Sequence, residues 1–140
     1  MGFDLQGKNP KMHTDEPPEG CHFDDYSQWL NENPGVYFRN NVWWWRATWD
    51  YICDKCSDIL SQKDVQGGNY NDGHYISGAK SLQIARRLDK LIKRGEVHAY
   101  ELAYAEWKDN QSEEVPYPFY EENVKRFSLF ARESGGFYIC

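Results

Sequence analysis

No stretch of this chain approaches the roughly 20 consecutive apolar residues that a membrane-spanning helix requires. The first residues also lack the basic and then apolar pattern of a secretory signal peptide. The mean hydropathy is −0.86, which is strongly polar. These absences favour a soluble protein that stays in the cytoplasm and has no membrane partner.

Positive charge is scarce. The chain has 16 Lys and Arg residues against 22 Asp and Glu residues, for a net charge of −6 at pH 7. General duplex-DNA binders gain affinity largely by neutralising phosphates, so we expect no general duplex nucleic-acid binding. The basic residues within 86–94 are interpreted as a solvated helix face, with a site for a small phosphate-bearing ligand as the alternative.

Familiar catalytic and nucleotide-binding motifs are missing. There is no P-loop, no Gly-x-Ser-x-Gly, no His-Glu-x-x-His and no dinucleotide glycine fingerprint. Asp72 and His74 share a turn, but general acid–base catalysis needs such groups to converge on a pocket. The sequence therefore favours a binding function over catalysis, with an enzyme as the alternative. It indicates no catalytic residue and no cofactor.

Cysteine is limited to four residues, two of which form a single Cys-x-x-Cys at Cys53 and Cys56. Zinc normally takes four ligands, and both cysteines fall on an apolar helical face, where a free thiol packs as a small hydrophobe. We predict free thiols in a reducing compartment and no metal site. The alternative zinc site would add ligands from Cys21, His22, His74 or Cys140.

Aromatic residues, in contrast, are abundant: 6 Trp, 10 Tyr and 7 Phe. Four of the tryptophans lie between residues 43 and 49. Either Asn40 or Asn41 can cap a helix, and from Val42 the apolar residues recur at helical spacing up to Leu60. This pattern predicts a helix over 42–60, with Trp45 and Trp49 in the core and Trp43 and Trp44 on its flanks.

The remaining periodicity predicts a mainly α (α+β) domain with four main helices. Beside 42–60, these are expected at 77–94, 96–109 and 120–133, and a short helix could form within 21–33. Residues 1–5 and 137–139 are expected to pair as strands in a two- or three-stranded patch, and Asp72-Gly73 could close a small hairpin. The chain is predicted to be a single domain, 1–140, with 8–34 a variable, partly loop-like insertion.

Two functional hypotheses follow. The first is a protein-interaction module that uses Trp43, Trp44, Arg39 and Arg46, because exposed Trp and Arg concentrate binding energy. The second is a binding protein or enzyme for a small phosphate- or nucleotide-bearing ligand, held by fixed cations and neutral donors. Its pocket would be built from Arg39, Asn40, Asn41, Arg46, Asp72 and His74. A flat aromatic patch favours the first, and polar groups converging in a cleft favour the second.

Four separated stretches carry a resemblance. They are residues 1–5, Phe-Arg-Asn-Asn-Val-Trp-Trp-Trp-Arg at 38–46, the 70–73 turn, and 117–137 with its Ser-Gly-Gly-Phe end. With these, the chain resembles a family of small uncharacterised proteins from bacteriophages and bacterial genomes. The resemblance implies a phage-associated protein of the host cytoplasm and no mechanism. Because the protein is small and acidic, we expect the interaction protein to be an inhibitor of a host enzyme or defence system.

Overall fold

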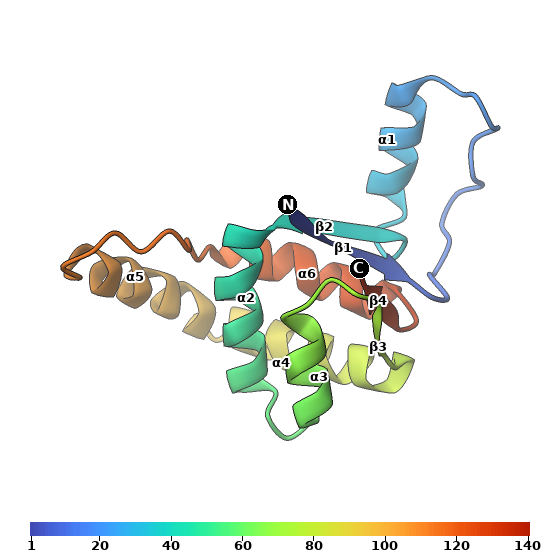
Figure 1. The fold of residues 1–140 in the computed structure, drawn as a ribbon. Coiled ribbons are helices and arrows are strands. Elements are labelled where there is room, and N and C mark those ends of the chain that lie inside the picture. The colour runs from blue at the N-terminus through green and yellow to red at the C-terminus, as the bar shows by residue number, and fades with distance from the viewer.

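An antiparallel sheet of four strands joins the two ends of the chain (Figure 1). The computed structural model describes all residues from 1 to 140. In spatial order the strands are β2 (Tyr37–Asn41), β1 (Gly2–Gly7), β4 (Phe137–Ile139) and β3 (His74–Ile76). β1 pairs with β4 in the register Leu5 to Ile139. The predicted pairing of the N- and C-terminal segments is therefore confirmed, but the sheet has four strands and not the two or three expected, because β2 and β3 pair on either side of β1 and β4.

Six helices accompany the sheet, so the predicted mainly α, α+β class is confirmed. Four are the expected main helices, one is the short helix considered within 21–33, and one, within 62–68, was not predicted. The six are α1 (Phe23–Glu32), α2 (Val42–Lys55), α3 (Gln62–Gly68), α4 (Gly78–Lys93), α5 (Glu96–Asp109) and α6 (Glu121–Glu133). None of them combines the length and the apolar character that crossing a membrane requires.

α2 begins where its sequence provides a cap. The Asn41 side chain accepts a hydrogen bond from the backbone N–H of Trp44 at 2.9 Å, which satisfies one free donor of the first turn. The helix ends at Lys55, so the predicted extension to residue 60 is wrong. The chain turns after Cys56 and still buries Leu60, which explains why the apolar spacing continued beyond the helix.

α3 was not predicted from the sequence, and its last residues, 66–68, were interpreted as the start of a turn-rich segment that extends to His74. Its start is a capping box: the Ser61 hydroxyl accepts from the Asp64 N–H at 3.1 Å, and Asp64 accepts from the Ser61 N–H at 2.9 Å. This box offsets the low helix propensity of Gly67 and Gly68. The hairpin expected at Asp72-Gly73 does not form, because β3 pairs with β4 and not with a strand before the turn.

The core lies between the inner face of the sheet and α2, α4 and α6. Alternation in β1 turns Phe3 and Leu5 inward, where the Phe3 ring stacks on Trp45 with centroids 5.8 Å apart. Trp45 also stacks on Trp49 at 5.3 Å, and both are fully buried. Their indole N–H groups donate to the backbone oxygens of Gly68 and Val65. The prediction that these two tryptophans belong to the core is confirmed.

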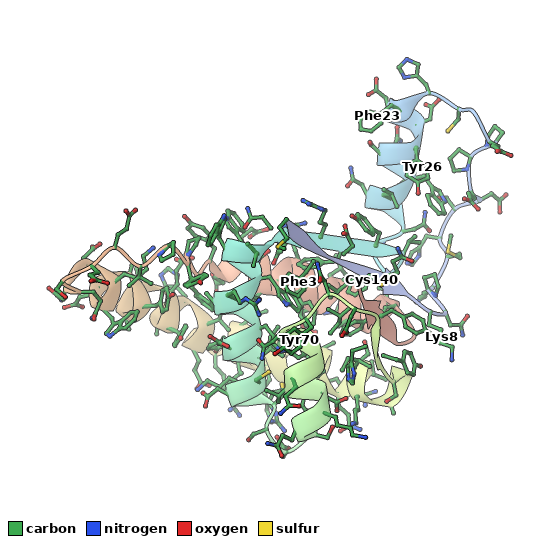
Figure 2. The ribbon with its side chains drawn as sticks, in the orientation of Figure 1. Phe3, Lys8, Phe23, Tyr26, Tyr70 and Cys140 are labelled. Carbon is green, nitrogen blue, oxygen red and sulfur yellow. The ribbon has the colours of Figure 1, made fainter.

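Residues 8–34 project from the sheet as an arm made of an irregular segment followed by α1 (Figure 1). Its base is fixed by Asn33, which is fully buried and whose Oδ1 accepts from the backbone N–H of His13 at 2.7 Å and of Thr14 at 3.2 Å. Phe23 and Tyr26 lie on this arm with exposed rings (Figure 2). The variability expected for this segment stays a prediction.

Candidate functional site

The eight residues predicted to bind a ligand or partner do not meet in one place. Asn40 is buried and exchanges hydrogen bonds with the side-chain amide of Asn123, at 2.9 and 2.7 Å. Asn41 is the α2 cap already described. The third polar residue, Arg39, points to the outer face of the sheet, where its Nε lies 3.3 Å from Asp4 Oδ1. Each of these residues is engaged by a neighbour within the fold.

The Asp72 and His74 pair of the turn is also separated. Asp72 is exposed, whereas His74 is half-buried and its Nε2 lies 2.9 Å from Oδ1 of Asp64. Lys80 on α4 contacts the other carboxylate oxygen at 2.5 Å. Asp64 and Lys80 were not singled out from the sequence. The Ser61-x-x-Asp64 spacing could have indicated the capping carboxylate, but nothing local indicates its two distant partners.

This cluster, defined by Asp64, His74 and Lys80, links α3, β3 and α4. Burial of Asp64 would raise its carboxyl pKa, but hydrogen bonds from Lys80, from the Ser61 backbone and from His74 outweigh burial and hold that pKa well below its usual range. The neighbouring Cys53 thiol has its pKa raised to about 12, chiefly by burial. The cluster therefore contains an ion pair but no activated nucleophile, and its geometry is that of a tertiary cross-link.

The two flanking tryptophans of α2 are directed elsewhere. Trp43 is 49% exposed and packs on Tyr117 with ring centroids 5.8 Å apart. Trp44 is half-buried and packs on Tyr120 at 4.8 Å. Both tyrosines belong to the segment between α5 and α6. The aromatic contacts thus join the start of α2 to a segment more than 70 residues away in the sequence.

These contacts continue along α5. Tyr104 donates its hydroxyl to the backbone oxygen of Tyr117 at 2.6 Å and packs on Trp107 at 5.7 Å. Trp107 is 51% exposed. Four partly exposed rings are thus connected, from Trp43 through Tyr117 and Tyr104 to Trp107, and Trp44 with Tyr120 forms a separate pair. The four rings and this pair are together called the α5 aromatic surface. Its members are Trp43, Trp44, Tyr104, Trp107, Tyr117 and Tyr120.

A small hollow of about 220 Å³ opens beside this surface, between α2 and α5. Its lining is Arg46, Ala47, Asp50, Tyr100, Tyr104 and Tyr117. The Arg46 guanidinium is committed to the fold, because Nη1 donates to the backbone oxygen of Asn69 at 2.7 Å and the group lies 5.3 Å from the centre of the Phe3 ring. The pKa of the Asp50 carboxyl is raised above its ordinary value, because the effect of burial exceeds the opposing effect of the Arg46 charge.

The chain segment that carries four of the six rings of the α5 aromatic surface is acidic. Residues 96–122 contain eight Asp and Glu residues and a single lysine, Lys108. The excess of acidic residues in this stretch is larger than the net charge of −6 of the whole chain. The exposed rings therefore lie in a local field that attracts cations.

The four cysteines are free and no group of three or more His, Cys, Asp or Glu side chains is clustered so as to hold a metal ion. Cys56 is fully buried at the end of α2, and Cys53 is half-buried one turn earlier. Burial raises the pKa of the Cys56 thiol to about 11. Both thiols behave as parts of the apolar interior.

A hollow of about 750 Å³ lies within the arm, between its irregular segment and α1. Glu16, Pro17, Cys21, Phe23 and Tyr26 are among its lining residues. None of the eight predicted residues borders it, and it is open and formed mainly by the arm itself. We therefore place the candidate site at the α5 aromatic surface.

Comparison of the chain with protein-family models, with curated proteins and with solved structures finds no match. The phage association implied by the sequence resemblance therefore stays a prediction, and the functional argument depends on the geometry of the α5 aromatic surface.

Proposed function

We propose that the protein is an interaction module that binds a basic segment of a partner protein through the α5 aromatic surface. The observation that carries this proposal is the connected band of partly exposed rings from Trp43 through Tyr117 and Tyr104 to Trp107, whose two end members are about half exposed. Large aromatic side chains dominate the energetics of protein interfaces. Rings within an acidic field bind arginine and lysine by cation–π contact.

The charge of the surroundings selects the partner. The acidic residues of 96–122 would repel an acidic partner and steer a basic one toward the rings. If the protein comes from a phage, as the resemblance implies, the class of partner that fits this surface is a host enzyme that acts on nucleic acid. The substrate groove of such an enzyme is basic. Binding there would inhibit the enzyme by excluding its substrate.

The alternative, a small phosphate- or nucleotide-bearing ligand, has less support. Its expected pocket required Arg39, Asn40 and Arg46 to converge, and each of them is engaged at a different place. The hollow beside α5 has a volume of about 220 Å³, which is below the usual range of about 300–1,000 Å³ for ligand pockets. Its one carboxylate, Asp50, would also repel a phosphate.

Isothermal titration calorimetry with an oligoarginine peptide tests the proposal. We expect binding that weakens as salt is added, and that weakens roughly tenfold on Trp43→Ala or Trp107→Ala, as for exposed tryptophans that concentrate the binding energy of an interface. Phe23→Ala is the matched control, because Phe23 is an exposed ring on the arm. Equal affinity for an oligoglutamate peptide, or an equal loss in the Phe23 variant, would contradict the proposal.

A further inference from the structure

β2 is an edge strand with an open hydrogen-bonding side. The backbone N–H of Gly7 donates to Val36, and that of Val42 donates to Met1, which fixes the residues that face β1. Since direction alternates along an antiparallel strand, Phe38 and Asn40 turn their backbone groups toward β1. Tyr37 and Arg39 must then turn theirs away from the sheet.

No other strand covers that side, because β2 is the first strand in the order β2-β1-β4-β3. The Arg39 carbonyl accepts a bond from the Asn40 side-chain amide at 3.0 Å. The N–H and C=O of Tyr37 and the N–H of Arg39 remain available. Exposed strand edges of this kind are templates for pairing with another chain.

A groove of about 210 Å³ runs beside the same edge, between the end of α1 and α6. Its floor is the Phe38 ring, and its walls include Leu30, Pro34, Leu129 and Phe130. Leu129 is 40% exposed although it lies among buried residues of α6. The groove therefore offers apolar surface to side chains that approach on the inner side of β2.

One cation lies in this groove without an acidic partner. The Arg126 guanidinium lies 5.1 Å from the centre of the Phe38 ring, and its one hydrogen bond is a long contact of 3.4 Å to Asn123 Oδ1. Its helix neighbours are paired: Lys125 with Glu121 at 3.6 Å, and Arg132 with a carboxylate of α4. Arg126 is thus free to bind a carboxylate from outside.

We propose that the β2 edge binds an extended, acidic-apolar segment of a partner protein by strand addition. The backbone of that segment would pair with Tyr37 and Arg39, and alternate side chains would enter the groove. Apolar side chains contact Leu129 and Phe38, and an acidic side chain two residues along binds Arg126. This site uses β2 and α6, and it is separate from the α5 aromatic surface.

The probe is the heptapeptide acetyl-TVTETVT-amide, whose valines and glutamate share one face of a strand. We expect it to shift the amide signals of Tyr37 and Arg39 in heteronuclear NMR spectra and to slow their hydrogen exchange. The lysine analogue TVTKTVT should bind at least about tenfold more weakly, because it loses the charge-assisted bond to Arg126. A TVTETVT peptide that is methylated on the backbone nitrogens facing β2 should not bind.

Two variants separate this site from a general acidic attraction. Arg126→Gln should weaken the binding of TVTETVT roughly tenfold, and Lys125→Gln, on the same helix, should leave it unchanged. Absence of binding at millimolar peptide, or equal binding of the methylated copy, overturns the proposal. Slow exchange of Tyr37 and Arg39 that depends on protein concentration without peptide also overturns it, since a second copy would then occupy the edge.

Discussion

Asn40 on β2 and Asn123 on α6 hold each other by two side-chain hydrogen bonds, of 2.9 and 2.7 Å, across 83 residues of sequence. The Asn123 Nδ2 group also donates to the hydroxyl oxygen of Thr48 on α2 at 2.9 Å. All three side chains are buried. This amide pair therefore joins the edge strand to both helices that cover it. Removing Asn123 leaves the buried Asn40 Oδ1 without a donor, while Asn40 Nδ2 keeps its bond to the Arg39 carbonyl.

Asn123→Ala is expected to reduce the free energy of unfolding by about 2–3 kcal/mol, because it leaves the buried Asn40 Oδ1 and the Thr48 hydroxyl oxygen without their donor. Urea denaturation followed by far-UV circular dichroism measures the change. The double variant with Asn40→Ala should lose less stability than the two single variants added together. A loss below about 0.5 kcal/mol for the single variant would show that the pair contributes little.

The tryptophan cluster should divide into residues that stabilise the fold and residues that do not. Trp45→Ala removes a fully buried ring and its bond to Gly68, so we expect a loss of about 3–5 kcal/mol or failure to fold. Trp43→Ala, at 49% exposure, should cost less than about 1 kcal/mol. Thermal melts of both variants under the same conditions make the comparison. Similar losses for both would place Trp43 in the core and remove it from the α5 aromatic surface.

The sequence was informative about the fold where one local pattern determined the outcome. Residues 1–5 and 137–139 were expected to be strands, and both strands exist. α3 was missed because the two glycines at its end read as a turn, while the cap that starts it is a contact between Ser61 and Asp64. The existence of a helix or strand could be predicted from the periodicity of its apolar residues, whereas the residues at which it begins and ends depended on capping contacts.

Only half of the candidate site could be predicted from the sequence. The helical positions of Trp43 and Trp44 indicated flanking rings, and this could be read from spacing alone. Their partners Tyr117 and Tyr120 are brought in by tertiary packing, which no local pattern reports. Tertiary packing also determines the partner of His74, whose ring contacts the carboxylate of Asp64 and not that of Asp72 in the same turn.

Thiol reactivity should follow burial. Cys53 and Cys56 have thiol pKa values raised to about 12 and about 11, chiefly by burial, so little thiolate forms near neutral pH. Iodoacetamide labelling followed by mass spectrometry should modify Cys21 and Cys140 well before the other two: Cys56 is buried, and Cys53, although as partly exposed as Cys21 and Cys140, has the raised thiol pKa. In denaturant all four should react at similar rates. Rapid labelling of Cys53 in the native protein would indicate that α2 opens at its C-terminal end.

Acid should destabilise the fold through Asp64. Its carboxyl pKa is held below the ordinary 3.8 by Lys80, the Ser61 backbone and His74, against the opposing effect of burial. A depressed folded-state pKa means that this stabilisation is complete above the unfolded-state pKa and is lost as pH falls toward the folded-state value. Stability should therefore decline below about pH 4, where the unfolded chain takes up a proton that the native carboxylate resists.

Asp64→Asn keeps the shape of the side chain and removes its charge. We expect it to cost on the order of 1–3 kcal/mol at neutral pH and to reduce the dependence of stability on pH in acid, as measured by urea unfolding across a pH series. Some dependence should remain, because Asp58 keeps a carboxyl pKa of about 2 through its hydrogen bonds with Arg87. Asp72→Asn is the matched control, since Asp72 is exposed in the adjacent turn. If both variants lose stability in acid as the parent protein does, the cross-link between α3, β3 and α4 does not govern its acid sensitivity.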